Sequence, residues 1–329
     1  MKRSILRAAL LLLKQLSATP ACAAFLVLNL SAALPSAAAA AEPSNRVIEV
    51  AAGVSLRVID RGPRNSLSPV VLIPGWGMSA DIWSEQADIL SRTRRVIAFD
   101  PRSQGQSTMV AHGVTPERRA EDLQALLKAL GLHNVTLVGW SQGVQDIAAY
   151  VQKFGTSEIS GAVLVDAPIS VGAGFVAKEP GKAAQMLSLL SLYAANPKDF
   201  AEGTLRHSFR KPLEPARRNR ILNDILATPT AIGTAMIISS RYGPDRTTAI
   251  PGFDRPVLVV ASAQSADLET LKAQAEALPC GSFEAIDDAG HAVFVDQPTL
   301  FSDRLAGFLT DRTVARCLQP ATGLKPPHD

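Results

Sequence analysis

The residues of this 329-residue chain that could act together in a reaction are a serine, a histidine and an aspartate. Ser141 lies in residues 139–143, which read Gly-Trp-Ser-Gln-Gly and match a G-x-S-x-G motif. An apolar strand pattern at 134–139 precedes the serine, and a helical pattern at 144–154 follows it. A serine on a sharp strand-to-helix turn holds its hydroxyl clear of the sheet, where a base can reach it. The context therefore predicts a nucleophile, although a Gly-rich loop with an inert serine has the same motif.

A serine needs a base to become nucleophilic at neutral pH, and His291 is the candidate. It follows the last predicted strand, 282–286, and precedes the last predicted helix, 299–309. The carboxyl ends of parallel strands share one edge of a sheet, so His291 and Ser141 are expected at the same edge. The chain has four other histidines, which lack this context: His112, His133, His207 and His328.

Two aspartates are candidates for the acid that orients the histidine. Asp166 ends the predicted strand 161–166. Asp267 begins the predicted helix 267–278, a position where an acid commonly only caps the helix. The pattern of residues alone leaves both open.

Acyl transfer to a serine also requires two N–H donors for the developing oxyanion. The backbone N–H of Gln142, at the start of a helix, is one candidate. The other is the backbone N–H of Trp76, between Gly75 and Gly77 in the loop after the strand 69–74. The Trp76 side chain either lines an acyl pocket or fills the core.

The elements that must position these residues alternate between strands and helices, which predicts a parallel sheet covered on both faces. Strands are expected at 46–50, 54–60, 69–74, 95–100, 134–139, 161–166, 256–261 and 282–286, and helices at 79–90, 116–130, 144–154, 267–278 and 299–309.

Residues 167–255 break the alternation with four predicted helices, at 181–194, 197–207, 214–227 and 229–240. We expect these residues to form a helical cap over the carboxyl edge of the strands, where ligands bind in open α/β sheets. The core is then residues 42–166 and 256–315, with a tail at 316–329.

Residues 1–41 have the layout of an export signal. Three basic residues precede an apolar region that reaches Leu34, and small residues follow up to Ala41. The chain is therefore expected in the periplasm or secreted, without a stable membrane anchor after cleavage; a retained anchor is the alternative.

Removal of this leader changes the net charge. Four of the 33 basic residues lie in it, so the remaining 29 basic residues and 30 acidic residues give a formal charge of −1. No basic footprint for nucleic acid stands out. Cys280 and Cys317 could form a disulfide in an exported protein.

Taken together, these motifs resemble the α/β-hydrolase superfamily over about residues 46–310. The resemblance is carried in the family's order by residues 74–77, 100–107, 139–143 and 289–291. Within the superfamily the chain is similar to the capped carboxylesterase and cofactor-free haloperoxidase-like group. The resemblance implies an α/β-hydrolase fold with a helical cap inserted before the penultimate core strand. It also implies a Ser141 nucleophile, a His291 base and an oxyanion hole from Trp76 and Gln142, with no cofactor and no metal.

The acid departs from the common family pattern. Most members place it about four residues past the strand that here ends at Ala261, where this chain has Gln264 and Ser265. Some relatives take the acid from the strand that here ends at Asp166, which favours Asp166 over Asp267.

The expected function is hydrolysis of a small to medium carboxylic ester through an acyl-enzyme on Ser141. A cofactor-free oxygenase or perhydrolase on the same fold is one alternative. A second is an NAD(P)-binding oxidoreductase, because residues 75–80 read G-x-G-x-x-A after a strand and Asp100 ends the next strand. The oligomeric state and the acyl and alcohol preferences are not set by the sequence.

Overall fold

A computed structural model of the chain describes residues 44–65 and 67–310. Its strands form one sheet in the order β1-β2-β4-β3-β5-β6-β7-β8. Strand β2 runs antiparallel to both of its neighbours, and the remaining pairs are parallel. The strands are β1 Ser44–Ala51, β2 Val54–Arg61, β3 Val70–Ile73, β4 Val96–Phe99, β5 Val135–Trp140, β6 Ile159–Val165, β7 Val257–Ser262 and β8 Gly281–Ile286. The predicted fold class, a mostly parallel sheet flanked by helices, is confirmed.

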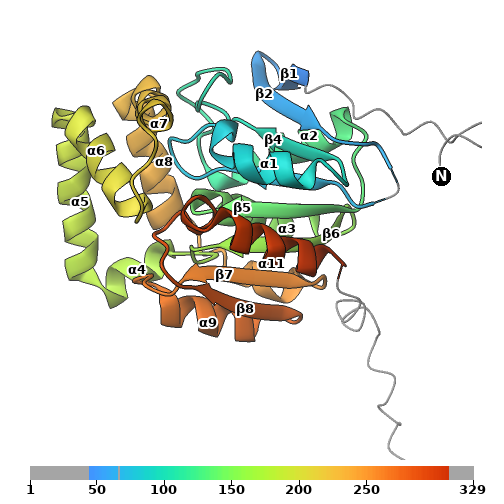
Figure 1. Cartoon of the computed structure of the whole chain (residues 1–329). Helices are drawn as coiled ribbons and strands as arrows, with labels where there is room; N and C mark the ends of the chain where they lie inside the picture. The colour runs from blue at the N-terminus through green and yellow to red at the C-terminus, as the bar shows by residue number, and fades with distance from the viewer. Residues whose placement is uncertain (1–43, 66, 311–329) are drawn as a thin grey trace, which may run out of the picture. The chain divides into compact units, whose positions relative to one another are not determined.

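Helices cover both faces of this sheet (Figure 1). Alternate residues of the central strands pack in two separate hydrophobic cores, one on each face of the sheet. In β5, Leu137 packs against helices 116–129, 142–154 and 268–277 on one face. Val138 packs against helices 84–90 and 298–310 on the other face. Because the strand is buried on both faces, its sequence is a continuous apolar run. The helices are α1 Ser84–Leu90, α2 Pro116–Ala129, α3 Gln142–Phe154, α9 Leu268–Ala277, α10 Val293–Asp296 and α11 Pro298–Thr310.

The predicted helix 79–90 is wrong in its first turn. A 3₁₀ turn, η1 Ala80–Trp83, comes before α1. The backbone N–H of Ala80 donates to Asp100 Oδ1 at 2.6 Å, so the carboxylate of the residue directly after β4 fixes this turn. Sequence propensity does not include such a tertiary contact.

Five helices lie between β6 and β7, and together we call them the cap: α4 Gly172–Lys178, α5 Pro180–Ala195, α6 Pro197–Ser208, α7 Pro215–Ala227 and α8 Thr230–Tyr242. Helices α5, α6 and α7 each begin with proline at the first position, where its missing N–H costs no hydrogen bond. Figure 1 shows α5 to α8 gathered at one side of the sheet. The glycine-containing α4 and the 3₁₀ turn η2 Thr247–Gly252 were not predicted. Glycine lowers helix propensity, which conceals a short helix such as α4.

Several predictions concern residues outside those the structure describes. They are the export signal at 1–41, the tail at 316–329 and the pairing of Cys280 with Cys317. Within 44–65 and 67–310, no single helix has the length and apolar character to cross a membrane. The bent pair α7 and α8, at 88° to each other, meets the criterion by length and composition alone.

Candidate active site

Ser141 lies at the turn between β5 and α3, in a backbone conformation that few non-glycine residues adopt. Its φ is 55° and its ψ is −117°. Such strain persists only where the surroundings impose it. Here the Ser141 N–H donates to the Val165 carbonyl at 3.0 Å, and the Ser141 carbonyl accepts the Val144 N–H at 3.0 Å. The serine is thus fixed between the neighbouring strand and the first turn of its own helix.

The two glycines of the motif are required by the close approach of backbone atoms. A Cβ at Gly139 would lie 2.5 Å from the carbonyl oxygen of Gly143. A Cβ at Gly143 would lie 2.7 Å from the carbonyl oxygen of Ile73, in β3. A side chain at Gly139 would therefore collide with the start of α3, and one at Gly143 would collide with β3.

His291 and Asp166 lie together at the edge of the sheet where β5 ends at Ser141. Nδ1 of His291 is 2.7 Å from Oδ2 of Asp166, whose side chain is 3% exposed. The other carboxylate oxygen, Oδ1, accepts the backbone N–H of Ser262 at 2.9 Å. Asp166 directly follows β6 with a φ of 48°. One oxygen of this carboxylate is therefore fixed by β7, and the other is directed at the imidazole.

Asp267 is placed differently. It is exposed at the N-cap of α9, and its side chain accepts no capping hydrogen bond there. The geometry pairs the imidazole with Asp166 and leaves Asp267 at the surface.

Contacts that sequence reasoning missed hold the backbone around His291. The indole N–H of Trp140, next to Ser141, donates to the His291 carbonyl at 2.9 Å. The two aromatic rings lie 5.3 Å apart between centroids. The hydroxyl of Ser262 donates to the Ala289 carbonyl at 2.7 Å. Trp140 stands inside the serine motif, so its identity was visible, but its contact with a residue 151 positions away was not.

The cap also supplies backbone contacts to the histidine loop. The Ala292 N–H donates to the Ser208 carbonyl, at the end of α6, at 2.8 Å. Asp296 accepts the backbone N–H groups of Gly290, Arg210 and Lys211 at 2.7, 2.9 and 3.0 Å. The loop that carries the imidazole is thus fixed by core and cap together.

The loop after β3 brings Trp76 close to Ser141. A Cβ at Gly75 would lie 3.1 Å from the Ser141 Cβ, so the backbone passes directly beside the serine. The Gln142 N–H is the first of α3, and the first N–H groups of a helix have no partner within the helix. The Trp76 ring packs edge-on against Tyr193 and Phe200 of the cap, at 5.4 and 5.6 Å between centroids.

Asp100, the acid of the dinucleotide alternative, is not accessible to a ribose. It is fully buried, and its oxygens accept the backbone N–H groups of Ala80 and Gln106 at 2.6 and 2.7 Å. Burial raises the pKa of this carboxyl. The Gly77 N–H donates to the Gln104 side chain at 2.8 Å, so this donor of the loop is not available to a pyrophosphate. Asp100 and Gly77 therefore have structural roles.

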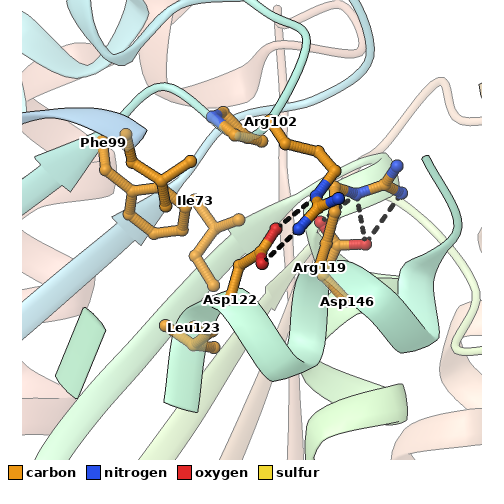
Figure 2. A pocket seen from close by; sticks show the side chains of 9 residues that line it. Ile73, Phe99, Arg102, Arg119, Asp122, Leu123 and Asp146 are labelled. Carbon is orange, nitrogen blue, oxygen red and sulfur yellow. Dashed lines mark hydrogen bonds and ion pairs between the residues drawn. The ribbon is translucent and has the colours of Figure 1, made fainter. Parts of the chain in front are cut away.

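Two buried ion pairs involve α2, and one of them joins it to α3, the helix that follows Ser141 (Figure 2). Arg119 of α2 donates to Asp146 of α3 at 2.9 and 3.0 Å, and Arg102 binds Asp122 through two hydrogen bonds of 2.5 and 2.6 Å. The hollow between these side chains is too narrow for a water molecule. It belongs to the packing of α2 against α3, and the carboxylate of Asp146 lies five residues beyond the serine.

His207, which has no supporting pattern in the sequence, lies in α6 beside the candidate base. Its ring centroid is 5.6 Å from that of His291. Partial desolvation of the ring, and next the charge of His291, lower the pKa of His207 below its ordinary value, although the residue keeps exposed surface. No sequence signal marks this residue, since α6 is far from His291 along the chain.

Among the described residues, no three His, Cys, Asp or Glu side chains are grouped to hold a metal ion.

Comparison with known proteins shows the family. The profile described as "Alpha/beta hydrolase family" matches residues 70–304. The chain belongs to the alpha/beta hydrolase family.

Two curated relatives share a segment with this chain. A non-heme haloperoxidase of Rhodococcus erythropolis is 39% identical over 100 residues, which are 30% of this chain and 36% of that protein. A bifunctional esterase/perhydrolase of Acinetobacter calcoaceticus is 35% identical over 117 residues, 35% of this chain and 42% of that protein. The chain thus spans about two fifths of the length of these relatives.

Solved structures of the family match over most of the chain. An esterase from Exiguobacterium antarcticum superposes with a TM-score of 0.73 at 21% identity, over 82% of this chain and all of that one. A bromoperoxidase from Bacillus anthracis gives 0.73 at 24% identity with the same coverage. These likenesses establish the fold.

Proposed function

We propose that this alpha/beta hydrolase cleaves a small to medium carboxylic ester through an acyl-enzyme on Ser141. The observation that carries the proposal is the 2.7 Å contact between Asp166 and His291, at the sheet edge where β5 ends in the strained Ser141. The esterases among the family's solved structures are consistent with this substrate class.

Asp166 accepts the Nδ1 proton of the imidazole and leaves Nε2 as the proton acceptor. Ser141 Oγ attacks the ester carbonyl while its proton passes to Nε2 of His291. The backbone N–H groups of Trp76 and Gln142 stabilise the oxyanion that forms. The alcohol leaves with the proton from His291, and water, deprotonated by the same imidazole, then releases the acid.

Covalent labelling tests this proposal directly. A fluorophosphonate should add one phosphonyl group to the wild-type chain, and peptide mass mapping should locate it on Ser141. Ser141→Ala should lose the labelling and should lower turnover of p-nitrophenyl esters by several orders of magnitude at an unchanged melting temperature. Esterase activity retained by Ser141→Ala would refute the mechanism. A series of esters of increasing acyl length would define the acyl preference.

Perhydrolysis is a second candidate, favoured by the names of the relatives. A haloperoxidase and an esterase/perhydrolase share about 100 residues with this chain. In this reaction hydrogen peroxide, instead of water, attacks the acyl-serine; it gives a peracid and regenerates the serine hydroxyl. Peracid formation from an ester and peroxide, absent in Ser141→Ala, would establish it.

We also propose that residues 1–41 direct export and that the mature enzyme acts in the periplasm or outside the cell. The N-terminal sequence of the protein recovered from a periplasmic fraction would test this. A chain that keeps Met1 and stays with the cytoplasmic fraction would contradict it.

A further inference from the structure

Both residues proposed to supply the oxyanion N–H groups have side chains that bind a single helix of the cap, α8. The indole N–H of Trp76 donates to the Gly233 carbonyl at 3.0 Å. Nε2 of Gln142 donates to the Met236 carbonyl at 3.2 Å and also to the Ser240 hydroxyl. Trp76 follows β3 and Gln142 follows β5, so one helix binds both sides of the proposed hole.

The orientation of the Gln142 amide follows from its partners. The Ser240 hydroxyl donates its own proton to the Met236 carbonyl at 2.8 Å. Its oxygen is then an acceptor for Gln142, and the Met236 carbonyl can only accept. Both partners therefore require the NH₂ group of Gln142, and Gln142 and Ser240 are 6% and 5% exposed. A buried amide with two acceptors in place has little freedom to move.

Helix α8 is itself anchored at both ends. At its C-terminal end Arg246, with no exposed surface, donates to the carbonyls of Ser239 and Ser240 at 3.3 and 3.4 Å. The same guanidinium pairs with Glu117 of α2 at 2.7 Å. Near the other end, a Cβ at Gly233 would lie 2.4 Å from the hydroxyl of the buried Tyr193. The absence of a side chain at Gly233 therefore lets α8 approach α5 and present its carbonyl to the indole.

We propose that α8 positions the oxyanion hole, with Ser240 as the positioning residue for Gln142 and the Gly233 carbonyl as the positioning group for Trp76. This inference rests on the proposed function, because it assigns a role in that reaction. Neither Ser240 nor Gly233 contacts the reacting atoms; each acts through the side chain of a residue whose backbone N–H does. Through α8, the cap thus contributes to kcat by holding the two N–H donors in position.

The consequence is a separation between turnover and ground-state binding. The oxyanion exists in the transition state and not in the bound ester, so a displaced N–H donor lowers kcat and leaves KM nearly unchanged. Loss of a complete oxyanion donor costs about 10²- to 10³-fold in kcat. A donor that is kept but loosened should cost less, about 10-fold.

Ser240→Ala and Ser239→Ala form a matched pair for the test. Ser239 is on the same helix, and its hydroxyl also donates to the Met236 carbonyl, at 3.0 Å, and to Val114 at 3.2 Å. Its hydroxyl does not bind Gln142. Ser240→Ala should lower kcat about 10-fold and weaken a trifluoromethyl ketone inhibitor by the same factor, at a KM within twofold of wild type. Ser239→Ala should keep kcat, KM and inhibitor affinity within twofold.

Gln142→Met provides a second variant, because it removes the side-chain donor and keeps the backbone N–H. It removes the hydrogen bonds to both Met236 and Ser240, so it should lower kcat at least as much as Ser240→Ala. Combining the two changes should add no loss beyond that of Gln142→Met, since the contact with Ser240 is already broken. Ser240→Thr restores a hydroxyl and should recover kcat.

Equal kcat and inhibitor affinity in Ser240→Ala and Ser239→Ala would overturn the inference. Additive losses in the double variant would also overturn it. Failure of the proposed function would look different: wild type would then give no fluorophosphonate adduct on Ser141, whatever the behaviour of the α8 variants.

Discussion

The substitution Asp166→Asn should change which nitrogen of the His291 ring carries the proton while leaving the ring in place. In the native chain Oδ1 accepts the Ser262 N–H at 2.9 Å, and Oδ2 lies 2.7 Å from Nδ1 of His291. A backbone N–H can only donate, so an asparagine must turn its oxygen to Ser262 and its NH₂ group to His291. That NH₂ group donates to Nδ1 and moves the ring proton to Nε2. The imidazole stays in place, but Nε2 can no longer accept the Ser141 proton.

The expected loss is about 10⁴-fold in kcat, the size of effect that a wrong tautomer has in a Ser-His-Asp site. At about 1.36 kcal/mol per factor of ten, this is about 5.4 kcal/mol of transition-state stabilisation. Steady-state hydrolysis of a p-nitrophenyl ester measures it, with labelling of Ser141 by a fluorophosphonate as a second readout. Asp267→Asn is the matched control; it alters an exposed carboxylate and should stay within about twofold of wild type. A fully active Asp166→Asn, or a large loss in Asp267→Asn instead, would refute the reasoning.

Three further predictions concern the supports of the site. Gly143→Ala places a Cβ 2.7 Å from a carbonyl oxygen of β3, and should lower the free energy of unfolding by about 1–3 kcal/mol together with kcat, measured by urea titration and ester hydrolysis. Asp146→Ala leaves the buried Arg119 without its carboxylate and should cost about 3–5 kcal/mol in the same titration; a loss below about 1 kcal/mol would contradict it. For His207, partial desolvation of its ring and the charge of His291 lower the folded-state pKa below the ordinary 6.5, although the residue keeps exposed surface. The unfolded chain then binds the proton first, so the stability from the neutral ring is lost as pH falls through 6.5 towards the lowered value. His207→Gln should flatten the decline of the melting temperature between about pH 7.5 and 5, and an unchanged slope would contradict the assignment.

The parts of the site that were predictable are those with a local signature. The G-x-S-x-G motif between a strand and a helix locates Ser141 because the sharp turn itself demands glycines at 139 and 143. The position of His291 followed from chain order alone, since a residue after the last parallel strand must lie at the carboxyl edge. Asp166 and Asp267 satisfied the same rule equally well. They are distinguished in space by the 2.7 Å contact of Asp166 with Nδ1 of His291, whereas Asp267 is exposed at the N-cap of α9.

The contacts that escaped prediction join elements far apart in sequence. Trp140 and His291 are 151 positions apart, and Gln142 and Ser240 are 98 apart. Neither pair has a periodic pattern, because each depends on how the cap and the last loop dock on the sheet. His207 was likewise unmarked, since its proximity to His291 follows from the docking of α6.

Asp166 occupies the point where the chain leaves the sheet for the cap. Its N–H donates to the Val260 carbonyl at 2.8 Å, and its Oδ1 is held by Ser262, so β7 fixes the residue on the main chain and the side chain. Insertions or deletions further along the cap should therefore change the position of this carboxylate little. A different set of cap helices could follow Asp166 without displacing its carboxylate, provided that it preserved the backbone contacts that the cap makes to the histidine loop. The junction between the sheet and the cap thus lies at the carboxylate that contacts His291.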